Sequence, residues 1–264
     1  PAVVLSIVLG WSLVFTALAI GVPTTLYTMF GGVQAVTWAD VKQMVVIVGG
    51  VSAAVLVLIF GMPDGVGVGE ALHVAGATGR LTTIDFSLDL TETYTFWSGL
   101  LGGLFLMLGY FGCDQSQVQR YLTAQSVDAG RRSLLMSAFW KIPLQAMILL
   151  TGVLVFVFYL FHEPPMLFNT AHESEIRAGA RATELTELET RFHTAFEDRR
   201  DAADQMIAAR RSGDAAAIAD TREHFVDSQA QFTEVRAGAV ELVRQVSGDA
   251  EYTDVNYVFP TFIT

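Results

Sequence analysis

Polar side chains gather at the end of one long apolar segment, where they could bind a solute. Residues 96–108 are apolar and rich in glycine, and the run that follows, from Gly109 to Arg120, holds an acid and several amides. Inside a hydrocarbon layer each unsatisfied polar group costs several kcal/mol. The run is therefore typical of an interrupted helix beside a solute site at the membrane midplane. Alternatively, the residues from Asp114 onward form the cytoplasmic end of the helix, and spacing alone does not decide between the two.

Lys141 is a second charged group in an apolar setting. It lies between Trp140 and Ile142, about eight residues into the apolar block 133–161, which is roughly 12 Å along a helix. An ammonium at that depth is costly unless it is paired or reaches a cavity. We therefore favour a functional position for Lys141. The alternative is that its four-carbon stem reaches back to the membrane interface.

Asp40 stands near the start of another apolar block. Thr37 precedes it by three residues, a spacing that fits a capping arrangement at the start of a helix, where an acid also suits the helix dipole. Capping is the simpler interpretation. Gln43, nearly one turn further on, adds a polar group on almost the same face, so that a role for both residues in an inner cavity stays open.

The elements that carry these residues are apolar blocks long enough to cross a membrane. The chain is 52% hydrophobic and only 16% charged, with a mean hydropathy of +0.44, whereas soluble domains carry about a quarter charged residues. Crossing a bilayer takes about 20 residues of helix. We predict an all-α membrane protein with four spanning helices at about 2–26, 38–60, 95–121 and 133–161.

The basic residues in short loops predict the orientation of these spans. Arg120, Arg131 and Arg132 flank the connection between the third and fourth spans, whereas loop 62–93 has Arg80 alone. Loops enriched in Lys and Arg stay on the cytoplasmic side. Loop 62–93 and the region after residue 161 are therefore expected outside the cytoplasm, in an integral membrane protein of, we predict, the bacterial inner membrane.

Residues 162–258 form an acidic insertion of a different kind. They hold 19 of the 27 acidic and 10 of the 16 basic residues, and hence −9 of the net charge of −11. Apolar residues recur at heptad spacing on both sides of Ser212–Gly213–Asp214, which predicts an extracytoplasmic antiparallel coiled-coil hairpin. A purely structural hairpin is the simpler interpretation, and an extracytoplasmic partner is the alternative. Residues 259–264 are expected to begin a further span, so the chain is a fragment.

Other classes of function are disfavoured by what the chain holds. Cys113 is the only cysteine, and the five histidines do not stand at the spacing of a helical metal motif. A phosphate-binding loop with its lysine is missing. The acidity belongs to one solvated segment, and nothing resembles the basic footprint of a nucleic-acid-binding protein. We expect neither an enzyme nor a nucleic-acid partner, but contact with membrane lipid and a small solute.

Two motifs carry a resemblance to a known family. The first comprises Tyr27–Thr28, Gly31–Gly32, Ala35–Val36, Trp38, Asp40 and Gln43, and the second comprises residues 110–115 with Gln119–Arg120. With these motifs the sequence resembles the sodium/solute symporter family, which includes sodium/glucose and sodium/proline transporters. The match covers residues 1 to about 161 and resumes at Phe259–Pro260. It implies the inverted-repeat bundle of leucine-type transporters, with the four spans as core helices four to seven.

The resemblance also implies roles for individual residues. Tyr110 falls at the position of the aromatic inner gate, with Phe111 beside it, and Lys141 at that of a solute-contacting lysine. Met107 replaces an asparagine of the sugar transporters and so removes a hydrogen-bond partner for a sugar. Gln115, in the same motif, completes the predicted substrate contacts.

Asp40 matches an acid of the inner sodium path, to which we add Gln43. The resemblance implies that the main sodium site of the family, its metal site, lies on helices outside this chain. We expect symport of a small polar solute, sugar-like or an organic acid, with Na⁺ as the coupling ion. The alternatives are a proton-coupled transporter or a transporter-like sensor on the same scaffold, and, third, a structural membrane scaffold.

Overall fold

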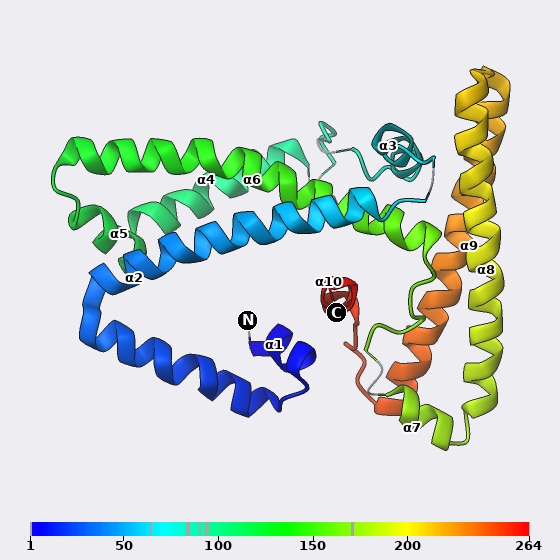
Figure 1. The fold of residues 1–264 in the computed structure, drawn as a ribbon, viewed down its shortest axis with the longest axis horizontal. Coiled ribbons are helices and arrows are strands. Elements are labelled where there is room, and N and C mark those ends of the chain that lie inside the picture. The colour runs from blue at the N-terminus through cyan, green and yellow to red at the C-terminus, as the bar shows by residue number, and fades with distance from the viewer. Residues whose placement is uncertain are drawn as a thin grey trace.

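The computed structural model describes residues 2–63, 65–82, 85–89, 91–92, 95–169 and 172–263. The predicted insertion 162–258 and final segment 259–264 therefore each include residues outside this description. Every regular element within it is helical, and one short 3₁₀ turn spans Val255–Tyr257. The α-helices (Figure 1) are α1 Ala2–Leu9, α2 Leu13–Phe60, α3 Val68–Ala77, α4 Phe96–Gly112, α5 Gln115–Leu122, α6 Val127–Phe161, α7 Glu173–Ala178, α8 Ala182–Ser212, α9 Ala215–Ser247 and α10 Val258–Ile263.

Two glycines shape the first part of the chain. Gly10, with φ of 67°, ends α1, and Ser12 then caps α2 by accepting a hydrogen bond from the Phe15 N–H at 3.3 Å. The break divides the region where one span over 2–26 is expected. Within α2, Gly32 adopts φ 54° and ψ −150°, a conformation that essentially only glycine reaches. A single residue thus separates two arms of α2, and the chain between residues 26 and 38, expected to connect two spans, is helical on either side of Gly32.

The second arm of α2 lies beside α6, and in Figure 1 both run toward the same end of the molecule. Leu58 packs there with Leu154 and Val155 in a buried cluster. Helices α2 and α6 are long and apolar enough to cross a membrane. The pair α4 and α5, bent by 57°, counts as a third span if it is taken as one broken helix.

The apolar side chains of these helices are mostly exposed. Phe30 on α2 is 82% exposed, Phe105 on α4 72% and Ile142 on α6 69%. Large exposed apolar surfaces belong against lipid or other protein. These surfaces are therefore suited to contact with bilayer lipid and with other helices.

Helices α8 and α9 form a hairpin that buries its own apolar seam. Gly213, with φ of 72°, makes the turn, and Asp214 caps α9 by accepting hydrogen bonds from the Ala216 and Ala217 N–H groups. The predicted heptad positions meet between the helices. Buried residues of the seam are Leu185, Phe192, Ala202, Met206, Phe225, Phe232, Ala239 and Leu242. The supercoil of a coiled coil stays a prediction.

The hairpin lies across one end of α6, beside α3 (Figure 1). Arg211 pairs with Glu70 of α3 at 2.6 Å, and Arg210 donates to the Gly69 carbonyl at 2.7 Å. A shared apolar core joins α3, α6, α8 and α9 through Val74, Leu160, Ala202, Ala203, Met206, Ile207 and Phe225. The hairpin is thus docked on the spans rather than tethered by a linker.

The Glu70–Arg211 pair is one of the polar contacts of this docking. Glu70 also accepts a hydrogen bond at 2.9 Å from the N–H of Gly67, the residue that precedes α3. The bond from Arg211, with the Gly67 N–H second, lowers the pKa of Glu70 to about 2. The carboxylate therefore stays ionised far into acid.

Candidate solute and ion site

The polar run after residue 108 does break the helix. Asp114 begins α5 by accepting hydrogen bonds from the Ser116 N–H at 2.8 Å and the Ser116 hydroxyl at 2.6 Å. Aspartate is a favoured first cap because its short carboxylate satisfies the free N–H groups of a new helix. Helix α5 then leaves α4 at 57°. The chain therefore has a bent helix pair here, whereas the sequence alone was equally compatible with a simple helix end.

Three of the predicted solute contacts come together at this bend. The Lys141 Nζ lies 5.3 Å from the centre of the Phe111 ring, within the range of a cation–π interaction. The Tyr110 and Phe111 rings meet edge to face with centres 5.1 Å apart. The Tyr110 hydroxyl accepts a hydrogen bond from the Gln117 side chain at 2.7 Å. The cluster offers a cation, a hydroxyl and aromatic faces.

The other two predicted contacts precede and follow this cluster along the chain. Met107, one turn before Phe111 on α4, is 45% exposed. Gln115, the first residue of α5, is exposed, and its side chain makes no hydrogen bond to another residue that the structure describes. Both stay predictions as solute contacts.

Asp40 has a partner that the sequence did not reveal. Its carboxylate lies 3.0 Å from the Arg120 guanidinium, an ion pair that ties the second arm of α2 to α5. The capping interpretation of Asp40 is wrong, because the helix begins further back: the Thr37 hydroxyl donates to the Val33 carbonyl and both residues are inside α2. The sequence places Asp40 and Arg120 only near the same expected end of two spans, which does not specify that they pair.

A pocket of about 410 Å³ adjoins this pair. It is lined by Thr37, Asp40, Val41, Met44, Arg120, Thr123, Ala124 and Ser133. Gln43 is exposed and does not line it. The structure therefore places Asp40, without Gln43, at a polar cavity near the bend between α4 and α5.

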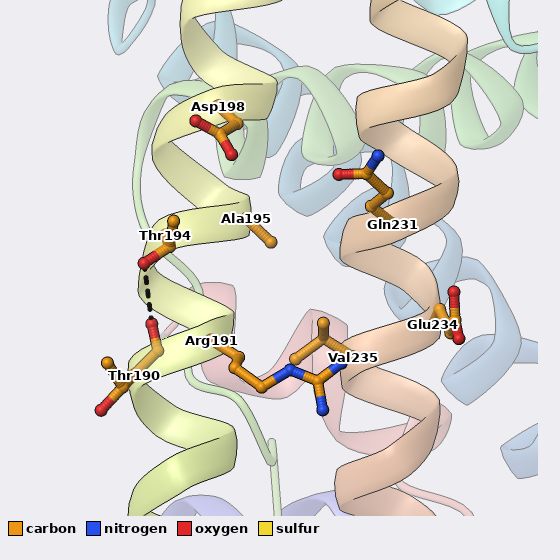
Figure 2. A pocket seen from close by; sticks show the side chains of 8 residues that line it. All are labelled: Thr190, Arg191, Thr194, Ala195, Asp198, Gln231, Glu234 and Val235. Carbon is orange, nitrogen blue, oxygen red and sulfur yellow. Dashed lines mark hydrogen bonds between the residues drawn. The ribbon is translucent and has the colours of Figure 1, made fainter.

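The hairpin has a groove of its own, of about 370 Å³ (Figure 2). Side chains of α8 and α9 flank it: Thr190, Arg191, Thr194, Ala195, Asp198, Gln231, Glu234 and Val235. The Thr194 hydroxyl is used within α8, where it donates to the Thr190 carbonyl at 3.1 Å. The lining includes two acids, Asp198 and Glu234, and one arginine, Arg191, so the groove has no surplus of positive charge.

Comparison with known proteins places the chain in a family. The sequence model of the family described as "Sodium:solute symporter family" matches residues 1–176. The match ends before α8, so the helical hairpin lies outside it. No solved structure matches the chain.

Individual relatives agree with the family match. The sodium-dependent multivitamin transporter of rabbit is 33% identical over 63% of this chain and 25% of its own length. The human sodium/iodide cotransporter is 33% identical over 63% of this chain and 26% of its own length. The mouse sodium-coupled monocarboxylate transporter 2 is 37% identical over 48% of this chain and 20% of its own length. The chain thus spans about a quarter of the length of the relatives it matches. The chain belongs to the sodium:solute symporter family.

Proposed function

We propose that the protein containing this chain is a sodium-coupled symporter of a small organic anion. The observation that carries the proposal is the cluster of Lys141, Phe111 and Tyr110 at the bend between α4 and α5. An ammonium deep in an apolar helix is compensated by an anion. The aromatic rings beside it suit the apolar body of an organic acid.

The relatives support an organic acid over a sugar. Two of them are named for anions, iodide and monocarboxylate, and all three for dependence on or coupling to sodium. Met107 supplies no hydrogen bond for a sugar hydroxyl. A carboxylate, in contrast, needs only the cation and a few polar partners.

We assign the inner ion path to the Asp40–Arg120 pair. The carboxylate of Asp40 can take an arriving Na⁺ when Arg120 swings away, because an ion pair with both partners about 40% exposed contributes only about 0–1 kcal/mol. The pair would then act as a latch at the cytoplasmic end. The spans would be core helices four to seven of an inverted-repeat bundle, with the hairpin outside the cytoplasm. The bacterial inner membrane stays a prediction, since the named relatives come from animals.

Uptake by the full-length protein in vesicles tests the solute site. We expect Lys141→Ala to abolish sodium-driven uptake of labelled propionate, because the anion loses the cation proposed to bind it, and Lys141→Arg to retain part of it. Tyr110→Phe removes the hydroxyl that holds Gln117 and should raise KM more than it lowers kcat. Lys42→Ala, on α2, is the matched control. Equal uptake by Lys141→Ala and the control would rule out the proposed site.

A further inference from the structure

A larger pocket, of about 640 Å³, lies where the hairpin meets the spans. Helix α6 contributes Val155, Phe156 and Tyr159 to it, and α9 contributes Gln229 and Phe232. Pockets of roughly 300–1,000 Å³ hold small ligands. From Lys141 to Tyr159 is about 27 Å along α6, so this pocket is separate from the cluster at the bend.

The charges that line this pocket are predominantly positive. Four arginines, Arg80, Arg199, Arg236 and Arg244, face a single acid, Asp254. Arg236 is neutralised by Asp254, whose two carboxylate oxygens both lie 2.7 Å from one guanidinium nitrogen. The hairpin is acidic as a whole, so the face of it that lines this pocket is opposite in charge to the rest of the hairpin.

Arg199 is the least satisfied of these side chains. It is only 3% exposed, and its Nε has no hydrogen-bond partner among the residues that the structure describes. Its other nitrogens donate to neutral acceptors, the Tyr159 carbonyl at 2.6 Å and the Gln229 side chain at 3.4 Å. Burial, and then the charge of Arg80, lowers the pKa of Arg199 to about 9. A buried cation without a counter-ion is destabilising.

Arg80 completes the arrangement from the loop after α3. Its guanidinium lies 4.0 Å from the centre of the Phe156 ring. Neither Arg80 nor Arg199 forms an ion pair with a carboxylate in the part of the chain that the structure describes. Two guanidiniums thus line one pocket beside the aromatic side chains of α6 and α9, and neither is paired with a described carboxylate.

We propose that this pocket is a second anion site, which binds a small organic carboxylate on the hairpin side of the spans. The carboxylate lies between Arg199 and Arg80, where each guanidinium can donate charge-assisted hydrogen bonds. The apolar body rests against Phe156 and Phe232. A compact carboxylate fits better than a two-chain phospholipid, because a pocket of about 640 Å³ has the size that holds small ligands.

Binding of benzoate to the purified full-length protein tests this site. Titration calorimetry is carried out on the Lys141→Ala variant, which removes the cluster at the bend, in nanodiscs of phosphatidylcholine. We expect benzoate to bind, and benzamide, which has the same shape without the charge, not to bind. Arg80→Gln and Arg199→Gln should each weaken benzoate binding roughly tenfold or more, as expected for a lost charge-assisted bond. Arg200→Gln, on the neighbouring residue, should leave it unchanged.

Three results would overturn the proposal. One is equal binding of benzoate and benzamide. Another is unchanged affinity in Arg80→Gln, whose exposed side chain can be replaced without disturbing the fold even if Arg199→Gln does not fold. The third is loss of benzoate binding in nanodiscs with phosphatidylglycerol, together with reduced phosphatidylglycerol retention by Arg80→Gln, which would assign the site to lipid headgroups. Persistence of benzoate binding in phosphatidylglycerol supports the organic anion.

Discussion

The spans and the hairpin solve the same problem of covering apolar side chains in opposite ways. Phe192 and Phe232 of the hairpin are 3% and 5% exposed, with ring centres 4.8 Å apart. Phe30 and Phe105 of the spans remain 82% and 72% exposed. The hairpin buries its apolar residues within this chain, whereas the spans need lipid and other helices. The stability of the hairpin can therefore be tested by changing residues of its own seam.

The largest expected effect on stability lies in the hairpin seam. Replacing Phe232 by alanine leaves a cavity beside Phe192 and should lower the local free energy of unfolding by about 3–5 kcal/mol. Hydrogen exchange of α8 and α9 amides in the full-length protein measures this loss. Val226→Ala, at a 39% exposed position of the same helix, is the control. Equal exchange in the two variants would mean that the hairpin is not held by its own seam.

The next effect concerns the bend in α2. Alanine at position 32 is strained by about 1–3 kcal/mol, because φ of 54° with ψ of −150° is a glycine conformation. Gly49→Ala, in helical backbone with no atom within 4 Å of the added methyl group, should instead be neutral or stabilising by about 0.5–1 kcal/mol. Thermal unfolding of the full-length protein compares the two. Similar melting temperatures would show that the two arms do not depend on Gly32.

A smaller effect is expected at the contact between the two regions. The pKa of Glu70 falls from 4.5 to about 2 on folding, so its ion pair with Arg211 stabilises docking fully above pH 4.5. That contribution is lost as the pH falls from 4.5 toward 2. Distances between spin labels on α3 and α8 should therefore broaden over this window. In the Glu70→Gln variant, docking should be weaker at neutral pH, and the label distances should not change across this pH window. A pH response that this substitution leaves unchanged would contradict the assignment of the response to Glu70.

The smallest effect belongs to the exposed face of the hairpin. His193 lies 3.0 Å from Glu163, and chiefly this bond raises the pKa of the imidazole above 6.5. The contribution of this ion pair to stability is full below pH 6.5. It is lost as the pH rises through the higher pKa that His193 has in the folded state. Titration of the His193 ring signals by NMR should show the raised pKa in the wild type and a return toward 6.5 in Glu163→Gln. A pKa that does not move would remove Glu163 as the partner.

Local patterns were enough to predict much of the fold. The turn at Gly213 and the buried heptad positions of α8 and α9 followed from spacing, and the break after α4 was one of two interpretations of the polar run. These features depend on residues near one another in the sequence. The break at Gly10 had no such signal, because an isolated glycine in an apolar run is compatible with a continuous helix.

Contacts between distant segments could not be predicted in this way. Arg199 interrupted the apolar stripe of α8 and gave no hint of its bond to the Tyr159 carbonyl, forty residues earlier. Asp40 and Arg120 were each explained by a local rule, capping or charge orientation, and their pairing needs the bend between α4 and α5. The cluster of Tyr110, Phe111 and Lys141 was expected as a group only from the family resemblance.

The direct test of the account is the ion that drives uptake. Vesicles with the full-length protein are given labelled propionate under an inward Na⁺ gradient, under a choline gradient at the same membrane potential, or under a proton gradient alone. The account predicts accumulation only with the Na⁺ gradient and its loss in Lys141→Ala. Equal accumulation without Na⁺, or accumulation driven by protons alone, would contradict sodium-coupled symport.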